Sequence, residues 1–170
     1  MAETIVSQGG VSVRMAKLAD VEEIHAILQE YALQGLLLPR TKEDLSRRIG
    51  NFRICEKDGF FAGCAALRDY GEGLYEVRSL AVKKSLRGEG IGSLLVSGIL
   101  ELLKKEGKSG RVFALTYRAS FFCRLGFRIV SKELFPQKIW SDCSICPKAA
   151  CCDETAVLIR IGPEGEKEEK

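Results

Sequence analysis

The hexapeptide Arg87-Gly88-Glu89-Gly90-Ile91-Gly92 lies between an expected strand, Leu74–Val82, and an expected helix, Ile91–Lys105. Its three closely spaced glycines remove the side chains that would keep a ligand away from the backbone. They also expose amide N–H groups at a helix N-terminus, which carries about half a positive charge. With Lys83 and Lys84 beside it, the segment predicts a phosphate cradle. The alternative interpretation is a tight strand-to-helix turn without a ligand.

Two common phosphate-binding patterns do not fit this hexapeptide. The dinucleotide fingerprint G-x-G-x-x-G and the P-loop G-x-x-x-x-G-K-[ST] both require other spacings. Around the hexapeptide, hydrophobic periodicity predicts the order β-α-α-β-β-β-α-β-α-β-β, an α/β arrangement with one central sheet. The expected strands are Val11–Met15, Phe52–Glu56, Phe61–Leu67, Leu74–Val82, Arg111–Leu115, Phe127–Val130 and Thr155–Ile161. The expected helices are one capped by Asp20 and ending near Leu33, one starting at Thr41, Ile91–Lys105 and Ala119–Leu125.

Composition places the chain among soluble globular proteins. It has 170 residues, 46% apolar and 29% charged, which suit one domain over residues 1–162, a Cys-rich insert at 131–154 and a disordered charged tail at 163–170. A net charge of +3 is too small to imply nucleic acid, and no apolar run approaches the ~20 residues that a bilayer requires. Without a secretory signal, we expect a cytoplasmic protein, and a homodimer is compatible with these features.

Cysteine and histidine counts limit the chemistry. Seven cysteines, an odd number without a signal peptide, favour reduced thiols over a disulfide framework. Cys55, Cys64 and Cys123 fall in strand or helix patterns, which predicts small core residues. The single histidine, His25, borders an apolar helical stripe and is expected to be structural.

The glycine hexapeptide is part of a wider resemblance. Arg87-x-x-Gly90-x-Gly92 matches the [QR]-x-x-G-x-[GA] signature of the GNAT acetyltransferases, and Leu80-Ala81-Val82 and Phe122-x-x-x-Gly126-Phe127 stand where those enzymes carry a strand and a second motif. The chain resembles this family over residues 11–161. The resemblance implies a central, mostly antiparallel mixed sheet flanked by helices, with acetyl-coenzyme A as donor. It assigns donor binding to Leu80, Ala81, Val82, Arg87, Gly88, Glu89, Gly90, Ile91, Gly92, Ser93 and Phe122.

Within the family, the chain is similar to the short, stand-alone N-acetylglutamate synthases of arginine biosynthesis. The shared stretches are Leu37–Arg40, Glu76–Val82, Leu115-Thr116 with Phe121-Phe122, and Lys138-Ile139-Trp140 followed by Cys143-x-x-Cys146-Pro147. This resemblance implies glutamate, or a close relative, as the acetyl acceptor. Alternatives are glutamine, another amino acid, a polyamine or a protein amine as acceptor. A non-catalytic module that binds coenzyme A or zinc is an alternative from a different class.

Glu76 is the candidate general base for deprotonating the attacking amine. It precedes Arg87 by eleven positions, the spacing at which some GNAT enzymes that acetylate histone lysines carry their base. Strand alternation would place Leu74, Glu76, Arg78, Leu80 and Val82 on one face, and a carboxylate among apolar neighbours suits proton uptake near neutral pH. The alternative is a structural ion pair with Arg78.

Candidates for the general acid and the oxyanion donor follow from the same resemblance. Many GNAT members carry a tyrosine where this chain has Phe122, so Tyr117 is the candidate general acid, with packing or coenzyme contact as the alternative. The resemblance suggests a distorted strand near Val82, whose backbone N–H would polarise the acetyl carbonyl. The acyl-pantetheine arm would then lie along Leu80–Val82.

Arg40, Arg78 and Lys138 are the candidates for binding an acidic acceptor, because each carboxylate of glutamate prefers a bidentate arginine or a lysine. The alternative for each is a solvated surface cation.

Cys143, Cys146, Cys151 and Cys152 lie within ten residues, and the first pair has the spacing of a metal knuckle. Structural Zn²⁺ is one interpretation of this cluster, and free thiols or a redox-sensitive disulfide are the others. The cluster lacks the basic and aromatic residues of a nucleic-acid finger.

Overall fold

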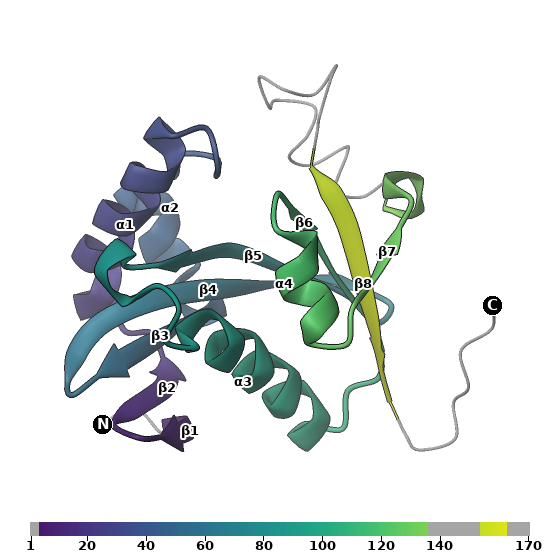
Figure 1. Ribbon diagram of the computed structural model, residues 1–170, viewed down its shortest axis with the longest axis horizontal. Coiled ribbons are helices and arrows are strands. Elements are labelled where there is room, and N and C mark those ends of the chain that lie inside the picture. Colours follow the sequence, from purple (N-terminus) through teal and green to yellow (C-terminus); the bar gives the residue numbers. More distant parts are fainter. Residues whose placement is uncertain (1–3, 136–153, 163–170) are drawn as a thin grey trace. The chain divides into compact units, whose positions relative to one another are not determined.

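The computed structural model describes residues 4–135 and 154–162 (Figure 1). The chain forms two compact units. Unit 1 comprises Met1–Arg68 and Val77–Glu106, and unit 2 comprises Asp69–Glu76 and Gly107–Lys170. The strands are β1 Thr4–Gln8, β2 Val11–Met15, β3 Phe52–Lys57, β4 Phe60–Gly71, β5 Leu74–Val82, β6 Gly110–Thr116, β7 Arg128–Val130 and β8 Thr155–Ile161. The α-helices are α1 Val21–Leu33, α2 Lys42–Arg47, α3 Ile91–Lys105 and α4 Ala119–Arg124.

Unit 1 is a sheet covered by helices. Strands β1 to β4 pair with their sequence neighbours in antiparallel fashion. Helices α1 and α2 cover one core cluster on this sheet, while α3 packs against β1, β2 and β3 (Figure 1). Successive side chains of β3 lie alternately on the α3 side of the sheet and on the side of α1 and α2. Phe52 and Ile54 are on the second side and are fully buried in the cluster beneath α1 and α2. The cluster consists of Val21, Ile24, Ile27, Leu28, Leu45, Phe52, Ile54, Phe61, Cys64, Ala66 and Ala81.

Unit 2 is built on the hydrogen-bonded strands β5, β6, β8 and β7. The first residues of β5, Leu74–Glu76, pair in parallel with β6, whereas β6 with β8 and β8 with β7 pair in antiparallel fashion. The two units together therefore contain a mixed sheet flanked by helices, as the sequence predicts. Phe113 stacks on Phe135 with ring centroids 3.9 Å apart, in a core with Leu74, Ala156 and Leu158. In the described part of the chain, no helix is long and apolar enough to span a membrane.

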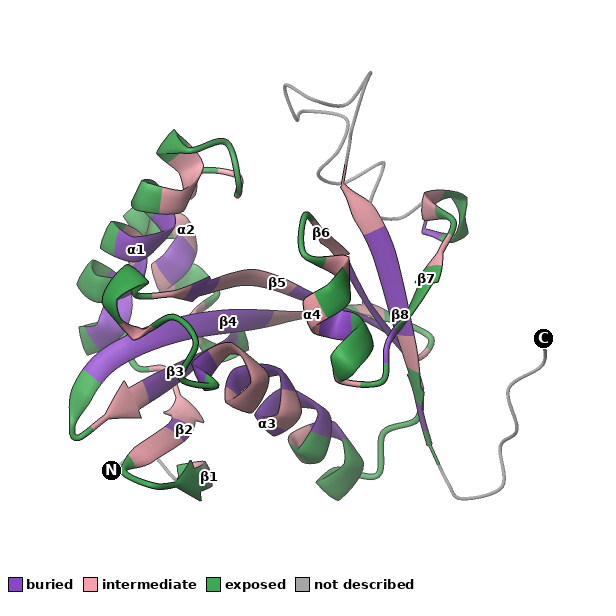
Figure 2. Ribbon diagram, viewed as in Figure 1, coloured by how far each residue is buried: buried purple, intermediate pink, exposed green. Residues whose placement is uncertain are grey.

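Most expected elements are confirmed within one or two residues at each end, although β4 is longer than expected. Figure 2 shows the buried stripe along α3. Thr41 caps α2 by accepting a hydrogen bond from the Asp44 backbone N–H at 3.1 Å. β3 and β4 are joined by a hairpin turn in which Asp58 and Gly59 both have positive φ.

Three details of the sequence prediction are wrong. Strand β1 was not expected, although Gly9-Gly10 supplies the turn that joins it to β2. Asp20 does not cap α1, because its carboxylate accepts hydrogen bonds from the Lys17 backbone and from Arg14 at 2.7–2.9 Å. Cys55 and Cys64 are buried as predicted, but Cys123 is exposed on the outer face of the short helix α4.

Candidate functional site

The glycine turn before α3 has the geometry of a backbone cradle. Gly88 and Gly90 have φ values of +83° and +81°, in the left-handed region that glycine adopts without strain. A β-carbon added at either position would have no protein atom within 4 Å, so both glycines border open space. Gly90 is also the N-cap of α3, and no side chain caps this helix end. The N-terminal N–H groups of α3 therefore offer a site for an anion.

Side chains around the turn hold it in place. Glu89 forms an ion pair with Lys57 at the end of β3. Arg87 lies over the ring of Tyr31, with its guanidinium carbon 5.8 Å from the ring centroid. Lys83 lies over the ring of Phe61 at 5.8 Å. These contacts tie the turn to α1, β3 and β4, all within unit 1.

Strand β5 is distorted at Ser79. This residue has φ +53°, a left-handed conformation that costs a non-glycine residue about 1–2 kcal/mol. Two groups hold it there: the Cys64 thiol donates to the Ser79 carbonyl oxygen at 3.6 Å, and Arg40 Nη1 donates to the Ser79 hydroxyl at 3.4 Å. The distortion interrupts the alternation of side chains along β5. The prediction that one face continues through Leu80 and Val82 is therefore wrong beyond Ser79.

Arg40 is a buried cation rather than a solvated one. Its side chain is 10% exposed, its Nε donates to Asp44 at 2.8 Å, and its guanidinium lies 5.0 Å above the centroid of the Phe52 ring. Burial lowers the pKa of Arg40, and the nearby positive charges of Arg78 and Arg48 lower it further, against the opposing effect of Asp44. The positive charges of Arg40 and Arg78 thus act on each other, and both guanidinium groups are donors suited to a carboxylate.

Glu76 is a buried carboxylate in unit 2. It is 2% exposed, and Tyr70 donates a hydrogen bond from its hydroxyl to Glu76 Oε1 at 2.8 Å. Tyr70 also stacks on Phe113, with ring centroids 6.0 Å apart, and this packing fixes the hydroxyl that meets the carboxylate. The buried carboxylate is therefore oriented by a polar partner rather than left without one.

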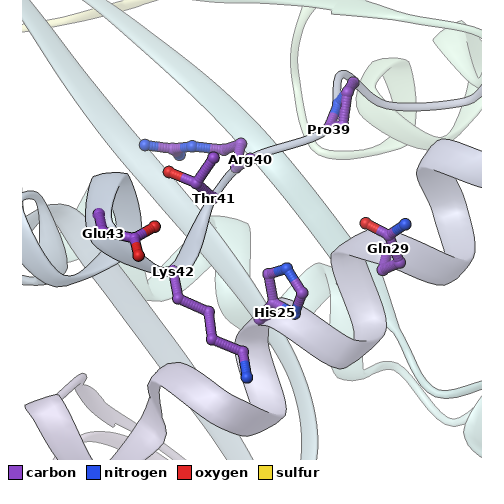
Figure 3. A pocket seen from close by; sticks show the side chains of 7 residues that line it. All are labelled: His25, Gln29, Pro39, Arg40, Thr41, Lys42 and Glu43. Carbon is purple, nitrogen blue, oxygen red and sulfur yellow. The ribbon is translucent and has the colours of Figure 1, made fainter.

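A surface pocket of about 460 Å³ lies in unit 1 between α1 and the segment that leads into α2 (Figure 3). His25 and Gln29 project into it from α1, and Arg40, Thr41 and Lys42 border it from the other side. Pro39 and Glu43 complete the lining. The sequence singled out only Arg40 of this set for binding, and the helical spacing of His25 and Gln29 is the signal that places both on one face of α1.

The remaining predicted residues have other surroundings. Phe122 is 4% exposed and packs edge to face with Phe121 and Phe127. Tyr117 is 38% exposed, just before α4. Lys138 and the four clustered cysteines lie outside the described residues, as does the 163–170 tail. Within the described ranges, no group of three potential ligands is placed to hold a metal ion.

Comparison with known proteins shows the family to which this chain belongs. Residues 48–129 match the model of the acetyltransferase (GNAT) domain. An uncharacterised N-acetyltransferase of Chlorobaculum tepidum is 43% identical over 146 residues, which cover 86% of this chain and 94% of the relative. The chain therefore belongs to the GNAT acetyltransferases, and it is an N-acetyltransferase that uses acetyl-coenzyme A as co-substrate.

Two further similarities concern longer proteins. An amino-acid acetyltransferase of Neisseria meningitidis is 35% identical over 136 residues, which cover 79% of this chain and 31% of that enzyme. N-acetylglutamate synthase from Neisseria gonorrhoeae, solved with coenzyme A and N-acetyl-glutamate, superposes with a TM-score of 0.80 at 29% identity. This match covers 93% of the present chain and 37% of the synthase chain. The chain thus spans about a third of the length of these two relatives.

Proposed function

We propose that this enzyme transfers the acetyl group of acetyl-coenzyme A to the α-amine of L-glutamate, the reaction that begins arginine biosynthesis. The observation that carries the proposal is the mostly buried guanidinium of Arg40, on which the positive charge of Arg78 also acts. Arg40 Nε donates to the Asp44 carboxylate. A dicarboxylate such as glutamate would accept hydrogen bonds from both guanidinium groups, whereas the positive charge of a polyamine would be repelled by them.

The donor would bind along the second half of β5 and the glycine turn. The pyrophosphate of acetyl-coenzyme A would meet the N–H groups at the start of α3, where Gly88 and Gly90 leave open space. The acyl-pantetheine arm would follow Leu80–Val82, and a backbone N–H near Val82 would stabilise the oxyanion of the tetrahedral intermediate. The left-handed Ser79 supports this part of the proposal, because strained backbone is concentrated where a site requires an unusual direction of a peptide group.

Glu76 would accept the proton of the attacking ammonium group, directly or through a water molecule. Its hydrogen bond from Tyr70 fixes the orientation of the carboxylate, which suits a general base. The amine nitrogen then bonds to the acetyl carbon, the carbon–sulfur bond breaks, and coenzyme A leaves as a thiol. Tyr117 remains the candidate that protonates the leaving sulfur, and Lys138 remains a candidate for the second acceptor carboxylate.

An acceptor panel tests this proposal. Purified enzyme is incubated with acetyl-coenzyme A and with glutamate, aspartate, glutamine, leucine or spermidine, and thiol release is followed continuously. We expect a kcat/KM for glutamate at least about tenfold above that for glutamine, because glutamine lacks one carboxylate for the cations. A preference for glutamine or leucine would reject an acidic acceptor, and thiol release only with spermidine would reject amino-acid acetylation.

A further inference from the structure

We infer that Tyr31 of α1 is a gate on the donor site: its hydroxyl occupies the edge of β5 that the pantetheine arm requires, and it must leave before acetyl-coenzyme A binds fully. The inference rests on the proposed path of the donor along Leu80–Val82. It adds a residue that the family motif does not contain.

The contacts of the Tyr31 hydroxyl use its whole hydrogen-bonding capacity. It donates to the Val82 carbonyl oxygen at 2.7 Å and accepts from the Val82 backbone N–H at 3.3 Å. It also accepts from Arg87 Nη2 at 3.3 Å. A tyrosine hydroxyl has one donor and two acceptor sites, so these three bonds leave none over. One side chain thereby holds a strand edge and the first residue of the glycine motif at once.

The edge that Tyr31 covers is the one turned away from β4. The next residue, Lys83, donates its backbone N–H to the Ala62 carbonyl of β4 at 2.9 Å. Because successive residues of an extended strand direct their N–H groups to opposite edges, Val82 directs its N–H and carbonyl away from β4. Gly63 allows the close approach on the β4 side, since a β-carbon there would lie 2.6 Å from the Ala81 carbonyl oxygen.

On the edge of β5 that is turned away from β4, the pairing of β5 with β6 comprises Leu74–Glu76 in the described part of the chain. The N–H and carbonyl of Val82 therefore form hydrogen bonds with the Tyr31 hydroxyl, at a place where the backbone of a neighbouring strand would otherwise bond to them. Pantetheine contains two amides, each with one N–H and one carbonyl, and such a group bonds to a strand edge as another strand does. The Tyr31 hydroxyl already bonds to both the N–H and the carbonyl of Val82, so neither a pantetheine amide nor the acetyl carbonyl oxygen can bond to Val82 while this hydroxyl is in place.

Tyr31 is placed to move. It lies in the last turn of α1, two residues before the helix ends at Leu33 and four before the left-handed Gly35, and its side chain is only partly buried against the core of unit 1. Release of its hydroxyl also frees Arg87 from one of two contacts, the other being the stacking on the Tyr31 ring. Opening the strand edge and freeing the motif arginine are thus coupled through one side chain.

Tyr31→Phe tests the gate, because it keeps the ring that packs on Arg87 and removes only the hydroxyl. We expect coenzyme A to bind about 3- to 10-fold more tightly by isothermal titration calorimetry, since the ligand no longer competes with an intramolecular hydroxyl at Val82. The fragment 3′-phospho-ADP, which lacks pantetheine, should bind within about twofold of its affinity for the unmodified enzyme. Tyr75→Phe, the same substitution in the first part of β5, is the matched control and should change neither affinity.

The outcomes separate the gate from the proposed function. Unchanged or weaker binding of coenzyme A to Tyr31→Phe, with normal binding to the unmodified enzyme, overturns the gate and leaves the donor site intact. Equal tightening of coenzyme A and 3′-phospho-ADP also overturns it, because the effect would then act through Arg87 and the phosphates. Failure of the unmodified enzyme to bind coenzyme A would overturn the donor site itself.

Discussion

Replacing Gly90 by alanine adds one methyl group at the N-cap of α3, and the structure separates its two consequences. Gly90 has φ +81°, so alanine is strained in this conformation whatever the space around it. The strain should lower the free energy of unfolding by about 1 kcal/mol, which corresponds to a fall in Tm of about 2–4 °C for a chain of this size. No protein atom lies within 4 Å of the added carbon, so no clash in the free protein contributes.

The second consequence concerns the ligand. The methyl group would occupy the open space from which the pyrophosphate of coenzyme A approaches the N–H groups of α3. Loss of one charge-assisted hydrogen bond costs about 1.5–3 kcal/mol, which weakens binding by about 10- to 100-fold. Isothermal titration calorimetry with coenzyme A measures this loss, and thermal unfolding without ligand measures the strain.

Gly71 provides the matched control. It is the last residue of β4, has φ +82°, and would also place a β-carbon with no protein atom within 4 Å. Gly71→Ala should therefore show the same fall in Tm with unchanged affinity for coenzyme A. If Gly90→Ala bound coenzyme A as tightly as Gly71→Ala does, the cradle would be refuted, and the glycine turn would be a structural connection only.

Three further substitutions test other parts of the site. Glu76→Gln should lower kcat by about 100- to 10,000-fold with unchanged binding of coenzyme A, and an unaltered rate from pH 6 to 9 would exclude Glu76 as the base. Arg40→Ala should raise the KM for the acidic acceptor at least about tenfold and that for acetyl-coenzyme A less than twofold; a defect confined to the donor would contradict its assignment. Burial raises the pKa of the Cys64 thiol from an ordinary 9.0 to about 12, so the unfolded chain loses this proton first and stability falls as pH rises through this range. Tm should therefore decline less steeply above pH 9 in Cys64→Ala than in the unmodified enzyme, and equal slopes would count against the burial of this thiol.

Local patterns predicted most elements because they record burial directly. The apolar residues of Ile91–Lys105 recur at helical spacing, and the helix has these bounds. Strand β1 was missed because an edge strand with mostly exposed residues carries little hydrophobic pattern, although Gly9-Gly10 marked its turn. The capping of α1 by Asp20 was wrong because Arg14, six residues away, and the Lys17 backbone N–H both donate to the carboxylate.

The sequence by itself determined the family, the glycine turn before α3 and the types of charge available for an acceptor, because these depend on residues that are adjacent or regularly spaced. Only the tertiary structure decided which distant groups meet along β5. Tyr31 reaches Val82 across 51 positions, and Arg40 reaches Ser79 across 39. Neither contact, nor the left-handed backbone of a serine within a strand, leaves a periodic trace in the sequence, because each arises from the packing of α1 and α2 over the sheet of unit 1.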